Sequence, residues 1–344
     1  MRWAGWLLAF WVACGGSGSG GSGGGSDVVT DGGVTTDGGV APDCVGLVPS
    51  PPRAAIAFDV ASNANDPMVC GPSIVDGAGF IAASAPTQSA PVQWKTFGPN
   101  GAYWGTFDAS SLLFPQPEGF MGLSGQVSFV TLWDGYGRGD LKNTAATAIG
   151  PAFGSGAIAL SADSASLTVI KVDAQASEIA STKVAGTFTP LAAAEDSSGA
   201  VLALTGNGSA VSGIWVDMAK QTAGQPFAVG TATSVKARPL LGGSIAIQLD
   251  GRWAGVVRPG EAALRLSPPW LGDGRDFIPA RGGSAYAVMP NSGNAIGIVS
   301  ALGNSCGSVA FPGVTAVSVG IDGTVVGSTG TAGCTKYVWR NALR

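Results

Sequence analysis

The sequence lacks histidine entirely and has few charged residues of either sign. With no His among 344 residues, the usual general base, the commonest metal ligand and the side chain that titrates near neutral pH are all missing. Charged residues make up 12% of the chain, about half their share in an average soluble domain. The 18 basic residues are scattered singly and the net charge is −4, so no basic stripe is available to neutralise phosphates. We therefore expect no nucleic-acid partner, no cofactor and no metal.

The sequence also begins with an apolar run that is too short to span a membrane. Arg2 is a minimal positive region, and the apolar residues from Trp3 to Val12 fall well short of the ~20 that a spanning helix needs. A small residue, Ala13, then precedes Cys14. Residues 1–14 therefore predict an export signal.

Val12-Ala13-Cys14 resembles the lipobox of bacterial lipoproteins, in which a small residue precedes a cysteine at the end of a short apolar segment. The resemblance implies a diacylglycerol on Cys14. With Gly15 after the cysteine instead of Asp, it also implies an outer-membrane destination. The alternatives are an ordinary secretory signal with an incidental cysteine, or an uncleaved anchor.

Residues 15–43 read as a disordered tether between the signal and a folded domain at 44–344. Residues 15–26 are only Gly and Ser, and the Gly-, Asp- and Thr-rich sequence after them cannot bury apolar surface. Gly18, Gly20 and Gly23 fit a dinucleotide-binding fingerprint, but no strand precedes them and no helix follows, so they are interpreted as linker.

The folded region repeats a glycine followed by a small, apolar, alternating run. Successive repeat glycines are 37 to 44 residues apart, the period of a four-stranded propeller blade. They also end turns such as Asp322-Gly323, as the start of a strand requires. The seven repeat glycines are Gly79, Gly119, Gly156, Gly199, Gly243, Gly283 and Gly323.

Three further strands are expected in each repeat. A short first strand should precede each repeat glycine. A third strand, sometimes with a core tryptophan, should begin about 13 to 16 residues after the glycine. Many of these first strands contain proline, which an edge strand tolerates. The prolines that precede the repeat glycines are Pro72, Pro115, Pro151, Pro190, Pro239 and Pro279. Outer strands are expected at 103–107, 179–184, 227–229, 262–266 and 309–311.

The last repeat lacks an outer strand, whereas a spare strand at 54–58 precedes the first repeat. Pairing the two would close a ring. The sequence thus predicts an all-β fold, a seven-bladed β-propeller with four antiparallel strands per blade, closed by an N-terminal strand in the last blade. A pair of β-sandwiches or a solenoid explains the repeat less well.

Four cysteines remain, and an even number in an exported chain suggests two disulfides. If strands alternate in direction, Cys44 and Cys306 fall on one face, and Cys70 and Cys334 on the other. The topology therefore favours Cys44–Cys306 and Cys70–Cys334. The local pairs Cys44–Cys70 and Cys306–Cys334 are the alternative.

Few residues are candidates for catalysis. Residues 303–307 match the G-x-S-x-G nucleophile elbow, but the motif needs a His partner, so we interpret them as a turn that holds half a cystine. Paired loop carboxylates could act on a glycoside, and Asp273 and Asp276 could hold Ca²⁺ with loop carbonyls. We interpret the loop aspartates as turn formers instead. The loop aspartates are Asp134, Asp140, Asp173, Asp217, Asp273 and Asp276.

Two classes of function fit these observations, and the sequence identifies no catalytic residue. The first is a non-catalytic, surface-displayed binding or envelope-assembly module, held to the membrane by its lipid, with an unknown protein or glycan ligand. The second is an extracellular carbohydrate-active enzyme that uses paired carboxylates. The chain resembles bacterial surface lipoproteins with propeller repeats, although its repeats lack the Gly-His and Trp-Asp dipeptides of one named repeat class. A channel-mouth pocket with paired acids and exposed aromatics would favour the enzyme.

Overall fold

The structure is a computed structural model. It describes residues 41–48, 56–59, 73–84, 92–99, 101–109, 113–124, 129–133, 138–139 and 146–343, apart from positions 175, 273–274, 281–282, 291–292 and 330–334. Contacts divide the chain into residues 1–32 and 33–344, and all described residues belong to the second unit. The expected signal with Cys14, most of the expected tether, Cys70 and Cys334 lie outside the described residues.

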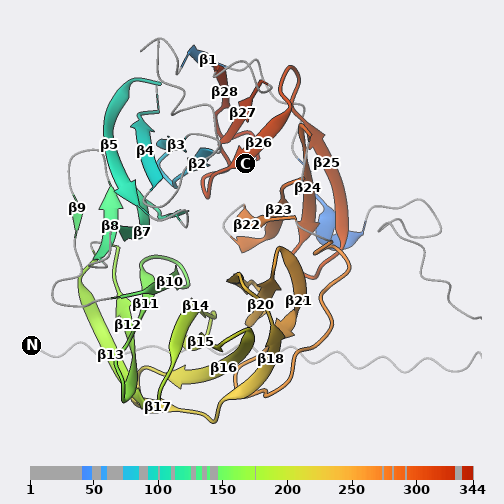
Figure 1. Cartoon of the computed structure of the whole chain (residues 1–344). Coiled ribbons are helices and arrows are strands. Elements are labelled where there is room, and N and C mark those ends of the chain that lie inside the picture. The colour runs from blue at the N-terminus through green and yellow to red at the C-terminus, as the bar shows by residue number, and fades with distance from the viewer. Residues whose placement is uncertain are drawn as a thin grey trace, which may run out of the picture. The chain divides into compact units, whose positions relative to one another are not determined.

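The described residues form seven antiparallel sheets, in which consecutive strands pair as meanders (Figure 1). Each sheet begins with a first strand that is usually short. The first strands are β2 (Ser73–Val75), β6 (Leu113–Pro115), β10 (Ala148–Pro151), β14 (Thr189–Glu195), β19 (Val235–Leu240), β22 (Phe277–Ala280) and β26 (Ala316–Val319). A 3-10 turn, η1 (Pro42–Cys44), precedes them all.

The second and third strands of each sheet follow where the repeat predicts them. The second strands are β3 (Ile81–Ser84), β7 (Phe120–Ser124), β11 (Ala157–Ala162), β15 (Ala200–Asn207), β20 (Ser244–Leu249), β23 (Ala285–Val288) and β27 (Val325–Ser328). The third strands are β4 (Val92–Phe97), β8 (Phe129–Trp133), β12 (Ser166–Val172), β16 (Ala210–Asp217), β21 (Arg252–Val257), β24 (Ala295–Ser300) and β28 (Thr335–Trp339).

All seven repeat glycines adopt the same backbone conformation, with φ between 72° and 89°. Residues with a side chain rarely adopt this left-handed conformation, because Cβ then crowds the following carbonyl. Each glycine ends the turn that connects the first strand of a sheet to its second. The conformation explains why the turn needs glycine and why the sequence repeats it.

The outer strands are less regular than the sequence predicts. They are β5 (Tyr103–Ala109), β9 (Arg138–Gly139), β13 (Glu178–Ala185), β17 (Thr222–Ala223), β18 (Phe227–Thr231), β25 (Ser305–Ala310) and β1 (Ile56–Asp59). In the fourth repeat the outer strand is split into β17 and β18, and Pro226, which has no N–H to pair, lies between them. Four strands per repeat is therefore not uniform.

The outer strand expected at 262–266 is wrong. Only a single bridge joins Val256 to Arg265, and the sheet β19-β20-β21 has three strands. Pro268 and Pro269 follow directly and have no N–H to continue a ladder. Pairing therefore ends after one bridge.

The spare N-terminal strand pairs with the last strand of the chain. β1 runs antiparallel to β28, with Ile56 opposite Val338 and Asp59 opposite Thr335, and the sheet order is β1-β28-β27-β26. First strands of different sheets also contact one another. β2 contacts β6 and β26, and β14 contacts β10 and β19. The described residues thus form an all-β domain of antiparallel sheets.

Apolar side chains from neighbouring sheets fill the spaces between them. One cluster joins Ile158 and Leu160 of β11 to Ile214 and Val216 of β16. Two of the third-strand tryptophans are buried in the core as predicted, since Trp94 and Trp339 are 3% and 5% exposed. Trp215 is half-buried, and the side chain of Trp133 lies outside the described part.

Candidate functional site

Four of the six prolines expected before the repeat glycines line one cavity, whereas Pro190 in β14 does not, and Pro72 lies outside the described residues. Pro115, Pro151, Pro239 and Pro279 lie in β6, β10, β19 and β22 and together border a space of about 260 Å³. Proline has no N–H to leave unpaired at an edge strand, and its ring is rigid. The cavity wall is therefore stiff and poor in hydrogen-bond donors.

The mouth of this cavity exposes large apolar side chains. Phe153 is 41% exposed and Ile321 is 36% exposed, and both lie in turns between first and second strands. Phe277 lines the cavity from a buried position. None of the described residues that line the cavity carries a carboxylate. The cavity can thus hold an apolar group but offers no acid pair for hydrolysis.

The polar side chains of the wall already have partners. The amide of Gln116 accepts a hydrogen bond from the N–H of Gly156 (2.6 Å) and donates to its carbonyl (3.2 Å). Arg238 Nη2 lies 3.5 Å from Asp276 Oδ2. Burial raises the pKa of Asp276, but the positive charges of Arg238 and Lys236 outweigh it and hold this pKa below its usual value. Asp276 therefore stays ionised and paired.

A second, larger groove of about 630 Å³ lies where the third sheet meets the fourth. Its lining combines Trp215 and the exposed Ile179 with two carboxylates, Glu195 and Asp217. Glu195 is buried at 2% exposure and lines this groove alone. Its Oε1 contacts Lys171 Nζ, and its Oε2 accepts the N–H of Phe153 at 3.0 Å.

Neither carboxylate of this groove is set up as a general acid. Asp217 accepts hydrogen bonds from Lys220 Nζ (2.8 Å) and from two backbone N–H groups. The hydrogen bond from Lys220 is the main cause that lowers the pKa of Asp217, whereas a general acid needs a raised one. Both oxygens of Glu195 are occupied by Lys171 and by Phe153. The groove therefore offers no carboxyl group that is free to donate a proton to a glycosidic oxygen.

The other loop aspartates form turns where they are described. Asp173 accepts the backbone N–H of Ser177 at 2.8 Å. Asp134, Asp140 and Asp273 lie outside the described residues. Within the described part, no three His, Cys, Asp or Glu side chains gather in a way that could hold a metal ion.

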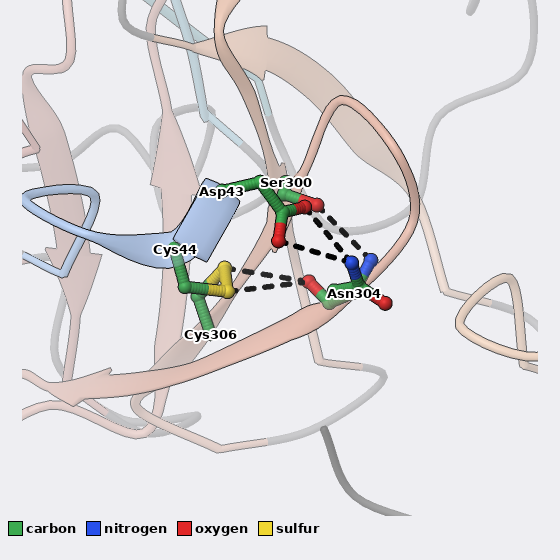
Figure 2. The surroundings of a disulfide bond; sticks show 5 residues. All are labelled: Asp43, Cys44, Ser300, Asn304 and Cys306. Carbon is green, nitrogen blue, oxygen red and sulfur yellow. Dashed lines mark hydrogen bonds between the residues drawn. A yellow bond between two sulfur atoms is a disulfide. The ribbon is translucent and has the colours of Figure 1, made fainter. Parts of the chain in front are cut away.

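A disulfide joins the segment before the first sheet to the outer strand of the sixth. Cys44 at the end of η1 pairs with Cys306 in β25, one of the two pairs that the topology favours (Figure 2). Beside it, Asn304 Nδ2 lies 3.1 and 2.9 Å from the two carboxylate oxygens of Asp43. Hydrogen bonds from Ser300 and then Asn304 lower the pKa of Asp43. Residues 303–307 thus form a turn and strand start that hold half a cystine.

Sequence reasoning missed a contact that repeats between sheets. Asp76 and Gln116 each stand three residues before a repeat glycine, and each accepts the N–H of the next repeat glycine, Gly119 or Gly156, at 2.6 Å. An acceptor at this fixed offset is visible in the sequence, but its partner about 40 residues away is not. These side chains brace neighbouring sheets at the face that carries the cavity mouth.

Asp76 is completely buried, and this changes its acidity. Its Oδ1 also accepts the N–H groups of Ala78 (2.9 Å) and Phe80 (2.7 Å). Burial raises the pKa of Asp76 to about 6, despite these hydrogen bonds and the one from Gly119, which lower it. The brace between the first two sheets is therefore sensitive to pH.

No helix within the described residues has the length and apolar character to cross a membrane. No protein-family model matches the chain, and no curated protein matches it.

Solved structures do resemble it. The WD40 domain of Neurospora crassa Pan2 is 13% identical with a TM-score of 0.49, covering 85% of this chain and 97% of its own. The Cps50 (Swd1) β-propeller domain of Myceliophteria thermophila is 10% identical with a TM-score of 0.46, covering 84% and 99%. BamB from Moraxella catarrhalis is 13% identical with a TM-score of 0.40, covering 79% and 83%. At such identities the likeness concerns architecture alone.

Proposed function

We propose that this chain is an exported, lipid-anchored β-propeller that binds an apolar segment of a partner protein and performs no catalysis. The membrane attachment rests on the sequence around Cys14 and on the Gly- and Ser-rich residues that follow it. The binding role rests on the cavity lined by first-strand prolines. Its exposed rim residues, Phe153 and Ile321, are the observation that carries the proposal.

In this proposal the seven sheets are the blades of one ring. Support comes from the contacts between first strands of different sheets and from the pairing of β1 with β28, which would close the ring in the last blade. The prolines of the first strands would then face the central channel, and the cavity would be its mouth. A ring of this kind presents a fixed surface, which suits recognition because little ordering entropy is lost on binding.

The size and chemistry of the cavity favour one apolar side chain of a protein over a sugar. About 260 Å³ is below the range of roughly 300–1,000 Å³ typical of sites for drug-sized ligands. Gln116 and Arg238 are already bonded within the protein, so few polar groups are free to bind hydroxyls. A single large apolar anchor in a stiff pocket is the usual centre of a protein interface.

A peptide-display selection against the full chain would test the binding role. We expect the enriched peptides to share one large apolar residue. Ile321→Glu should weaken their binding about tenfold or more, since it places a charge in an apolar pocket. The matched control is Ile179→Glu, which changes an exposed isoleucine of the groove and should leave binding unaltered. Peptides that bind Ile321→Glu as well as the wild type, or selection of peptides without an apolar anchor, would contradict the proposal.

A further inference from the structure

Three exposed apolar side chains gather beside the disulfide. Val45, Val48 and Leu302 are 73%, 41% and 81% exposed. The disulfide Cys44–Cys306 holds residues 44–48 against β25, where Val48 Cγ2 lies 3.6 Å from the position that a Cβ on Gly307 would take. Asn304, two residues after Leu302, binds Asp43. These three side chains are called the apolar patch below.

Two residues of the apolar patch, Val45 and Val48, lie on the outward side of a segment whose other side is packed against the domain. Leu47 packs against the core cluster of the sixth and seventh sheets, while Val45 and Val48 on either side of it point away from that core. Cys44 is 3% exposed. The segment is therefore held firmly by Cys44 and Leu47, and its exposed valines have a fixed place on the surface.

The two chain segments that carry the apolar patch have almost no charge. Asp43 is the one charged residue in the two described segments 41–48 and 300–308. Its carboxylate takes hydrogen bonds from Asn304 and Ser300. Charged side chains are the groups that are most costly to bring into a bilayer. A surface with a single, hydrogen-bonded carboxylate at its edge can approach lipid at little cost.

The chain itself indicates what covers the apolar patch. The residues that lead back from Cys44 reach Cys14, the expected lipid attachment site, after 30 positions. A Gly- and Ser-rich coil of that length has an r.m.s. reach of about 30 Å. Because the disulfide fixes Cys44 on the sixth sheet, the chain leaves the domain beside the patch. We infer that the apolar patch rests on the lipid surface of the membrane that holds the anchor.

This inference rests on the proposed lipid attachment for the direction of the tether, but the patch adds its own contribution. Linking two membrane contacts makes the second one intramolecular, so even a weak affinity of the patch suffices to hold it on the surface. Docking would fix the orientation of the domain by the sixth sheet. It would also keep the cavity mouth at a constant angle to the membrane.

The test is photocrosslinking of the full chain on phosphatidylcholine vesicles that contain a diazirine-labelled phosphatidylcholine. We expect crosslinks in peptides that contain residues 43–48 and 300–306. The double variant Val45→Ser, Leu302→Ser should lose about tenfold of this signal, because both side chains lose their apolar contact with lipid. The control Ile179→Ser removes another exposed apolar side chain, which is 56% exposed and lies in the third sheet, and should keep the signal.

Vesicle flotation of the wild type and of Cys14→Ser separates the two proposals. Loss of flotation in Cys14→Ser supports lipid attachment, whereas equal flotation of both chains contradicts it. The positions of the crosslinks are mapped in the wild type and in Cys14→Ser, and they test the apolar patch independently of the lipid anchor. Crosslinks that avoid residues 43–48 and 300–306, or that persist in the double variant, would overturn the inference. Self-association that the double variant abolishes while its lipid crosslinks persist would instead assign the patch to a second copy of the chain.

Discussion

The disulfide Cys44–Cys306 should contribute a large share of the stability of the domain. It joins residues 262 positions apart. In the chain-entropy model, closing such a loop removes about 5–6 kcal/mol of unfolded-state entropy at 25 °C. If the expected second cystine, Cys70–Cys334, is also formed, the first closes only the two arms between them, a loop of roughly 55 residues worth about 4 kcal/mol.

We therefore expect the variant Cys44→Ala, Cys306→Ala to lose about 4 kcal/mol in its free energy of unfolding. For a domain of about 300 residues this corresponds to a fall of roughly 6 °C in the thermal midpoint. Urea unfolding followed by tryptophan fluorescence measures the first quantity, and calorimetry the second. Adding a reductant to the variant should destabilise it further if Cys70 and Cys334 are paired.

The control is Asn304→Ala, which keeps the disulfide and removes the hydrogen bonds to Asp43. These hydrogen bonds are exposed to water, so we expect little change in stability. A double-cysteine variant that unfolds within 1 °C of the wild type would refute the loop argument, since the 1 °C limit is roughly a sixth of the shift expected. If the reductant leaves the stability of the double-cysteine variant unchanged, the second cystine, Cys70–Cys334, is refuted.

Two further predictions concern the contacts between sheets. The pKa of Asp76 is raised from 3.8 to about 6 in the fold, so folding takes up a proton between these values. The contribution of Asp76 to stability is therefore greatest below pH 3.8 and falls by about 3 kcal/mol as pH rises through 6. Urea titrations at several pH values should show that Asp76→Asn lacks this part of the slope, and an identical slope in both chains contradicts it. Gly150→Ala should destabilise the domain by about 3 kcal/mol or more, since its Cβ would lie 1.6 Å from the carbonyl oxygen of Ala193 in β14. Gly242→Ala meets nothing within 4 Å and serves as the control in the same thermal-unfolding assay, where equal midpoints for both variants would contradict the close approach of β10 and β14.

The strands that follow the repeat glycines were predictable because local chemistry specifies them. A turn that needs φ near +80° selects glycine, and the alternating apolar run after it selects a strand, so both signals lie within ten residues of each other. The outer strands were predicted less well. Their pairing depends on one neighbour alone, and the two prolines at 268 and 269 were enough to end it in the fifth repeat.

The candidate site was hardly predictable. The prolines of the first strands were visible in the sequence, but their meeting around one cavity depends on contacts between residues 40 to 160 positions apart. The same holds for Asp76 and Gln116, whose acceptor oxygens bind a glycine of the next repeat. Glu195 is one of only four glutamates in the sequence, and nothing local reveals that it joins Lys171 to the turn at Phe153.

The sequence by itself determined the period of the repeat, the residues of its turns, the absence of histidine chemistry and the strand left over at the N-terminus. These follow from backbone conformation and composition, which act over a few residues. The tertiary structure decided which side chains became buried, which acids met a cation and which apolar residues stayed exposed at the cavity mouth and beside the disulfide. Those outcomes depend on how neighbouring sheets pack, because burial and electrostatic pairing are properties of residues brought together in space.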